Sequence, residues 1–87
     1  MLSKQITINN PSGLHMRPAG VLVKTATPFK SAVSFDIRGN TYNAKSMINV
    51  LSAAVKRGDA IELRIEGEDE QACMDAVVSA IESGLGE

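Results

Sequence analysis

The chain has 87 residues, of which 44% are hydrophobic and 22% are charged, and this balance is that of one small globular domain. A single cysteine, Cys73, excludes an internal disulfide and suits a reducing cytosol. No segment approaches the about 20 apolar residues of a membrane span, and the first residues lack the apolar run of a signal peptide. We therefore expect one cytoplasmic domain over residues 1–87 that does not insert into a membrane.

The net charge of −1 conceals an asymmetry along the chain. Residues 1–58 carry eight cations and one acid, a net charge of +7, whereas residues 59–87 carry nine acids and one cation, a net charge of −8. Either one face attracts acidic partners, or the acidic part is simply a solvated helix. Nucleic acid is not an expected partner, because the chain has no basic run and only three aromatic residues.

The first elements in chain order are a strand and a helix. Ile6 and Ile8 alternate with polar residues, which is typical of a strand of about seven residues. Residues 10–13 have the composition of a turn. Apolar residues then recur at helical spacing from Met16, until Pro28 stops the helix near residue 27.

A hairpin is predicted next. Residues 33–38 alternate strictly between apolar and polar side chains, as in a strand with one buried face. Gly39 and Asn40 are the expected central residues of a two-residue turn, since glycine at the first position permits a positive φ. Residues 41–43 then begin a short return strand.

Two helices and one strand are expected in the second half. Ser46 is well placed as the N-cap of a short helix, which should end at Lys56, Arg57 and Gly58. Residues 61–66 alternate as a fourth strand. Acidic residues at 68–70 favour the start of a last helix, which continues with the buried Cys73 on its apolar stripe until Gly84.

The predicted order is β-α-β-β-α-β-α. Each strand has one polar face, so we expect a four-stranded antiparallel sheet with all three helices on its other face. This is the α+β class, in the form of a two-layer open-faced sandwich.

His15 is the only histidine and lies where a loop becomes a helix. Free N–H groups of the first helical turn, the fixed charge of Arg17 and the rigid Pro18 together suit a histidine that carries a phosphoryl group. A neutral imidazole nitrogen is also a competent nucleophile near neutral pH. On spacing alone, a solvent-exposed loop histidine with no role is the alternative to a phosphoryl carrier. A metal site lacks further ligands, and a general base lacks a carboxylate to orient the ring.

The run Gly13-Leu14-His15-Met16-Arg17-Pro18-Ala19 resembles the phosphorylation signature of HPr, the histidine-containing phosphocarrier of the bacterial sugar phosphotransferase system. The resemblance extends over the whole chain in length, element order, the residue 44–47 segment and the start of the last helix. It implies the open-faced sandwich. It also implies a carrier that is a substrate of enzymes rather than an enzyme, works as a monomer and needs no cofactor or metal.

The resemblance further implies the partners and the roles of two residues. His15 would receive a phosphoryl group on Nδ1 from enzyme I, which is itself charged by phosphoenolpyruvate, and Arg17 would pair with that group. The phosphoryl group would then pass to the IIA domains of sugar permeases. A regulatory paralogue that acts through partner binding is the alternative, although such relatives lack the acceptor histidine.

Ser46 has two readings. As an N-cap it needs no other reason to be serine. The resemblance implies a second role, because in some relatives the matching serine is phosphorylated by an HPr kinase/phosphorylase, and the product acts on a catabolite regulator. Added negative charge there would repel acidic partners.

The resemblance also implies a docking patch beside His15. Met47 and Leu51 fit either this patch or the core, whereas Ile48 falls off the helical stripe and favours a surface role. The cationic and polar residues expected around this patch are Lys24, Thr27 and Lys45.

Three positions depart from the family pattern. Met16 stands where a smaller residue or threonine is usual, which can alter access to His15. Gly20 weakens the first helix by up to about 1 kcal/mol relative to alanine. Residues 53–54 are both alanine where glycine is common, so the second helix can end differently.

Overall fold

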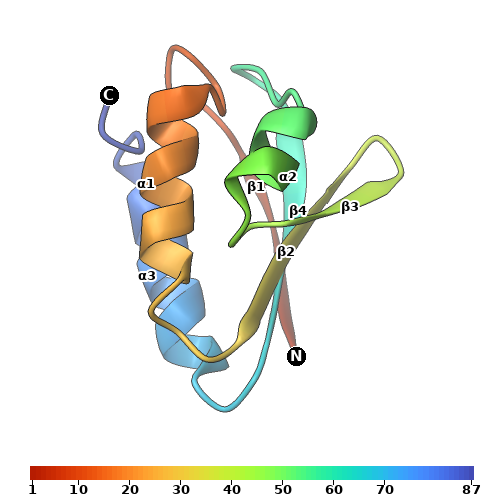
Figure 1. Ribbon diagram of the computed structural model, residues 1–87, viewed down its shortest axis with the longest axis vertical. Helices are drawn as coiled ribbons and strands as arrows, with labels where there is room; N and C mark the ends of the chain where they lie inside the picture. The colour runs from red at the N-terminus through yellow and green to blue at the C-terminus, as the bar shows by residue number, and fades with distance from the viewer.

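The computed structural model describes residues 1–87 and confirms the predicted order of elements (Figure 1). The order is β-α-β-β-α-β-α, and no peptide bond is cis. Their bounds, in chain order, are β1 Leu2–Thr7, α1 Met16–Ala26, β2 Ala32–Ile37, β3 Asn40–Asn43, α2 Met47–Ser52, β4 Ala60–Glu66 and α3 Glu70–Glu82.

The sheet is antiparallel throughout, with strand order β1-β4-β2-β3. Alternate residues of the central strands meet in register, such as Phe35 with Leu63 and Val33 with Ile65, and all four are buried. The three helices cover this apolar face (Figure 1). The opposite face is polar, and there Arg64 forms an ion pair with Asp36 at 2.6 Å. The open-faced sandwich and its single core are therefore confirmed.

The hairpin turn lies one residue earlier than the sequence predicted. Ile37 pairs with Asn40, so the central residues are Arg38 and Gly39, not Gly39 and Asn40. Both have positive φ, 51° and 79°, which is the type I′ geometry that matches the twist of the strands. Arg38 adopts this unfavourable conformation because its guanidinium is held away from the hairpin, by the Ala53 carbonyl and by the Asp59 carboxylate at 3.3 Å.

Helix α2 is shorter than predicted. It ends at Ser52 rather than at residues 56–58, and Ala54 takes a left-handed φ of 51° where glycine is the usual residue. The next residues cannot continue the helix because their backbone bonds elsewhere: the Val55 carbonyl accepts from the Leu14 N–H at 2.9 Å. The cations at 56–57 therefore lie in a loop beside the start of α1.

Asp69 links the loop before α3 to the loop after α1. Its carboxylate accepts hydrogen bonds from the Lys30 N–H at 2.9 Å, the Ser31 N–H at 2.9 Å and the Ser31 hydroxyl. These bonds, the one from the Ser31 hydroxyl foremost, hold the pKa of Asp69 below its usual value. Asp69 is the N-cap residue of α3, but its side chain makes no capping hydrogen bond and instead binds residues 30 and 31 in the loop after α1.

Two further expectations concern the burial of Cys73 and the lack of a membrane span. Cys73 is fully buried, as predicted, and burial raises the pKa of its thiol. No helix of the structure has the length and apolar content required to cross a bilayer.

Candidate functional site

His15 is the N-cap residue of α1, as its position before the helical stripe indicated. Its backbone is extended, with φ −72° and ψ −178°, and its carbonyl accepts from the Ala19 N–H at 2.8 Å. The imidazole is exposed and makes no capping hydrogen bond. The ring nitrogens are therefore open to a group brought from outside the chain.

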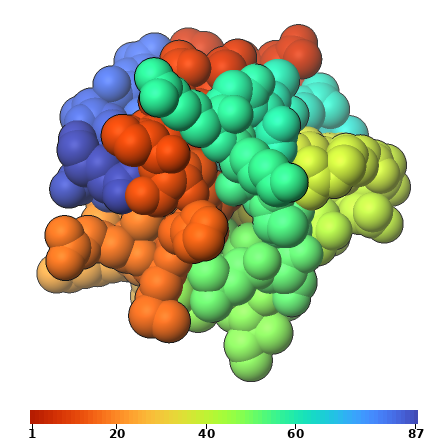
Figure 2. All heavy atoms as spheres, turned by 90° about the horizontal axis from the view of Figure 1, so that it is seen from above, coloured from red at the N-terminus to blue at the C-terminus, as the bar shows by residue number.

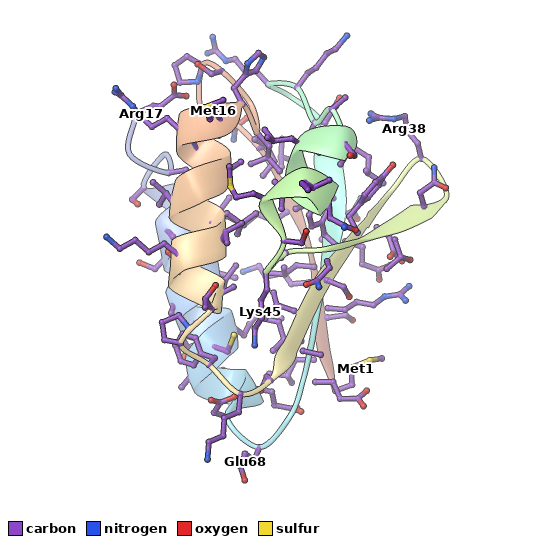
Figure 3. The ribbon with its side chains drawn as sticks, in the orientation of Figure 1. Met1, Met16, Arg17, Arg38, Lys45 and Glu68 are labelled. Atoms are coloured by element: carbon purple, nitrogen blue, oxygen red, sulfur yellow. The ribbon has the colours of Figure 1, made fainter.

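The first turn of α1 surrounds His15 with donors. The N–H groups of Met16 and Arg17 have no acceptor within the chain, because the helical ladder begins at Ala19. Pro18 lies in this turn, as predicted, and is buried, so it fixes the backbone and adds no N–H of its own. The Arg17 side chain is exposed and extends from this turn (Figure 3). This is an environment suited to a bound anion.

The loop before His15 is fixed against the loop after α2. Besides the bond between Leu14 and Val55, the Ile8 N–H donates to the Asp59 carbonyl at 2.9 Å. Gly13 has a φ of 61° and packs so closely that a Cβ there would lie 2.5 Å from the Val55 oxygen. Asp59 in turn receives the Lys56 N–H at 2.9 Å, the main reason its pKa lies below the usual value. His15 thus stands on a rigid support.

Three large apolar side chains of α1 and α2 are exposed to solvent. Ile48 is 78% exposed, Met16 72% and Leu51 38%, whereas Met47 is half-buried and packs on the core. A hollow of about 270 Å³ joins the patch to the histidine, and it is lined by Leu14, His15, Leu51, Ala54, Val55 and Lys56. Viewed from above, residues 10–20 lie next to the segment that includes α2 (Figure 2). The hollow therefore brings Leu51 next to His15, whereas Ile48 is exposed on the same helix as Leu51 and Met16 is exposed at the start of α1.

Ser46 is the N-cap of α2, as predicted. Its Oγ accepts from the Asn49 N–H and from the Asn49 amide, each at 3.3 Å, and the residue is partly exposed. The prediction that Ser46 is an N-cap is thus confirmed.

The three residues expected around the patch have different surroundings. Lys24 is exposed in the last turn of α1, nine residues from His15, or about 13 Å along the helix axis. The Thr27 hydroxyl donates to the Val23 carbonyl at 2.6 Å. The Lys45 ammonium donates to the Phe29 carbonyl at 2.6 Å, so it holds the loop after α1 in place rather than presenting its charge at the patch (Figure 3).

Sequence reasoning missed Asn10, Ser12 and Glu87. The Glu87 carboxylate accepts from the Asn10 amide at 2.9 Å, from the Ser12 N–H at 3.0 Å and from the Ser12 hydroxyl at 2.6 Å. These hydrogen bonds, that from Asn10 first, keep the pKa of Glu87 below its usual value, with a smaller contribution from the charge of Arg17. A separation of more than 70 residues leaves no local pattern from which this contact could be read.

These features define a class of small domain that displays a histidine on an open surface, between helix amides, an arginine and an apolar patch. No group of three or more histidine, cysteine, aspartate or glutamate side chains is arranged to hold a metal ion. The hollow beside His15, at about 270 Å³, is smaller than the about 300–1,000 Å³ that is typical of ligand pockets.

Comparison with known proteins agrees with this class. The sequence model described as "PTS HPr component phosphorylation site" matches residues 2–83. The phosphocarrier protein HPr of Lysinibacillus sphaericus is 39% identical over 88 residues, covering 100% of both chains. The HPr-like protein Crh of Halalkalibacterium halodurans is 38% identical and covers 94% of this chain and 98% of its own.

A solved structure is also similar over the whole length of this chain. The crystal structure of HPr from Thermoanaerobacter tengcongensis has a TM-score of 0.96 and is 39% identical, covering 100% of this chain and 98% of that one. The chain belongs to the HPr family of phosphocarrier proteins of the sugar phosphotransferase system.

Proposed function

We propose that the protein accepts a phosphoryl group on His15 from phospho-enzyme I and passes it to the IIA domains of sugar permeases. The observation that carries this proposal is the exposed imidazole at the start of α1, which no other part of the chain uses. In the first transfer a ring nitrogen of His15 forms a bond to phosphorus while the bond between phosphorus and the donor breaks. The second transfer reverses this step on the acceptor.

The surroundings of His15 support both transfers. The free N–H groups of Met16 and Arg17 and the Arg17 guanidinium can bind the phosphoryl oxygens without enclosing them. An open site lets a phosphoryl group arrive from one partner and leave to another. The exposed Ile48 and Leu51 give both partners an apolar surface close to the reacting atom, and Lys24 adds positive charge on the same helix as His15.

We further propose that Ser46 is a site of regulatory phosphorylation. The hydroxyl lies next to Met47 and Ile48, so a phosphate there would place about −2 charge at the edge of the docking patch. Partners with acidic surfaces would then dock less readily. An HPr kinase/phosphorylase would add the group, and a catabolite regulator would recognise it.

The test is incubation with enzyme I and radiolabelled phosphoenolpyruvate, followed by measurement of phosphate that is labile in acid and stable in alkali. Wild type should take up about one phosphate per chain and His15→Ala none. Ser46→Ala should take up as much as wild type, which makes it the matched control. Labelling of His15→Ala to the wild-type level would refute the proposal.

Similarity to the HPr-like protein Crh supports a second candidate, a regulator that binds partners without serving sugar transport. The two functions separate at the second transfer. A carrier charged on His15 should lose its phosphate to an added IIA domain within minutes, whereas a regulator should retain it. Retention in the presence of several IIA domains would favour the regulator.

A further inference from the structure

Residues 84–87 fold back from the end of α3 onto the start of α1 (Figures 1 and 2). Gly84, Leu85 and Gly86 all have left-handed φ values, of 94°, 51° and 85°. The Leu85 N–H donates to the Ala80 carbonyl at 3.0 Å, and the Leu85 side chain is fully buried. This segment therefore has a fixed path, which delivers Glu87 to the loop before His15.

Glu87 is the acceptor that organises this loop. The Ser12 N–H has no other partner in the chain, and the Ser12 hydroxyl bonds to the same carboxylate. Asn10 is only 4% exposed, and its amide nitrogen donates both to Glu87 and to the Gly13 carbonyl at 2.6 Å. The other amide atom of Asn10, Oδ1, has no partner, so the contacts of its nitrogen alone orient the buried side chain.

Charge connects this contact to His15. Glu87 bonds to Ser12, three residues before His15, and Arg17 follows His15 by two residues. The positive charge of Arg17 makes a small contribution to the lowered pKa of Glu87. A phosphoryl group on His15 carries about −2 charge and would attract the same guanidinium while repelling the carboxylate. A phosphoryl group on His15 would therefore weaken the contact between Glu87 and the loop of residues 10–13.

We propose that Glu87 is a positioning residue whose carboxylate holds the loop of residues 10–13 while His15 is uncharged, and that negative charge on His15 loosens this hold. The inference rests on the proposed function only for the source of that charge. The loop would be most ordered before the phosphoryl group arrives and most mobile when it is ready to leave.

The hold itself is tested by hydrogen exchange of the Ser12 amide, measured by NMR on the ¹⁵N-labelled full chain. Glu87→Ala should speed this exchange about tenfold, because a hydrogen bond to a charged acceptor is lost. Glu82→Ala removes an exposed acid of the same charge and should leave the rate unchanged. Equal rates in Glu87→Ala and wild type would overturn the proposal.

The response to charge is tested without any donor protein. His15→Asp places a negative charge at this position, and His15→Asn is its neutral counterpart of the same shape. At low salt the Ser12 amide should exchange about threefold faster in the aspartate variant, and the difference should shrink in 1 M salt. When Glu87 is also replaced by alanine, the Ser12 amide should exchange at the same rate in the aspartate and asparagine variants. Equal rates in the two variants would overturn the proposal, whether or not enzyme I phosphorylates His15.

Discussion

Replacing Gly13 by alanine would test how firmly the loop that carries His15 is held. The φ of Gly13 is 61°, a conformation that costs an alanine roughly 1–2 kcal/mol. The added Cβ would also lie 2.5 Å from the Val55 oxygen and 2.8 Å from the Lys56 Cα, and these are backbone atoms that cannot rotate away. The two loops must separate, which weakens the hydrogen bond between Leu14 and Val55, worth about 1 kcal/mol. We expect a total loss of about 3 kcal/mol of unfolding free energy.

Urea unfolding followed by circular dichroism measures this loss. With a typical dependence of about 1–1.5 kcal/mol per molar urea, the midpoint should fall by about 2–3 M. Gly39→Ala is the matched control, because φ is 79° there and nothing lies within 4 Å of the added Cβ. It should cost only about 1–2 kcal/mol, the conformational part.

Gly20→Ala should change the unfolding free energy in the opposite direction. This residue lies within α1, its added Cβ meets no atom within 4 Å, and alanine should stabilise the helix by about 0.5–1 kcal/mol. If Gly13→Ala unfolds at the same urea concentration as Gly39→Ala, the loop is not held against Val55 as described, and the reasoning is refuted.

Other predictions concern the N-cap residue Ser46, the loop contact of Asp69 and the buried Cys73. Ser46→Ala should lower the unfolding free energy by about 1 kcal/mol, whereas Ser46→Asp, which can also cap, should change it little in the same urea assay. Because the pKa of Asp69 is lower in the folded than in the unfolded chain, its carboxylate stabilises the fold above pH of about 4, and this stabilisation is lost as the pH falls through the folded-state value. The difference in urea midpoint between wild type and Asp69→Asn should therefore be larger at pH 7 than at pH 3. Cys73 should react with a thiol reagent more than about 100-fold more slowly in the native protein than in 8 M urea, since it is reached only through unfolding.

Most of the fold could be predicted because the strands carry their pattern locally. Val33, Phe35 and Ile37 alternate with polar residues, and all three are buried in the structure. The position of His15 could be predicted for the same reason, since Pro18 and the apolar stripe that follows mark the start of a helix without reference to the rest of the chain.

The errors arose where a tertiary contact outweighed a local preference. The hairpin turn is displaced by one residue because the Arg38 side chain reaches Ala53 and Asp59, and no rule for two-residue turns includes that contact. Helix α2 ends earlier than Gly58 predicts because Ala54, which is not glycine, takes the left-handed conformation. The contact between Glu87 and Ser12 joins the two ends of the sequence and has no local signature.

The path of residues 84–87 also bears on which end of the chain is better suited to a tag or to immobilisation on a surface. A tag, dye or sensor surface joined after Glu87 would transmit a mechanical force to Ser12, and from there to the loop that carries His15. Met1 lies at the opposite end of the molecule from Met16 and the start of α1 (Figure 3). Immobilisation through Met1 would therefore neither pull on the loop before His15 nor cover the histidine. Binding rates measured with the chain attached at Met1 and at Glu87 should differ.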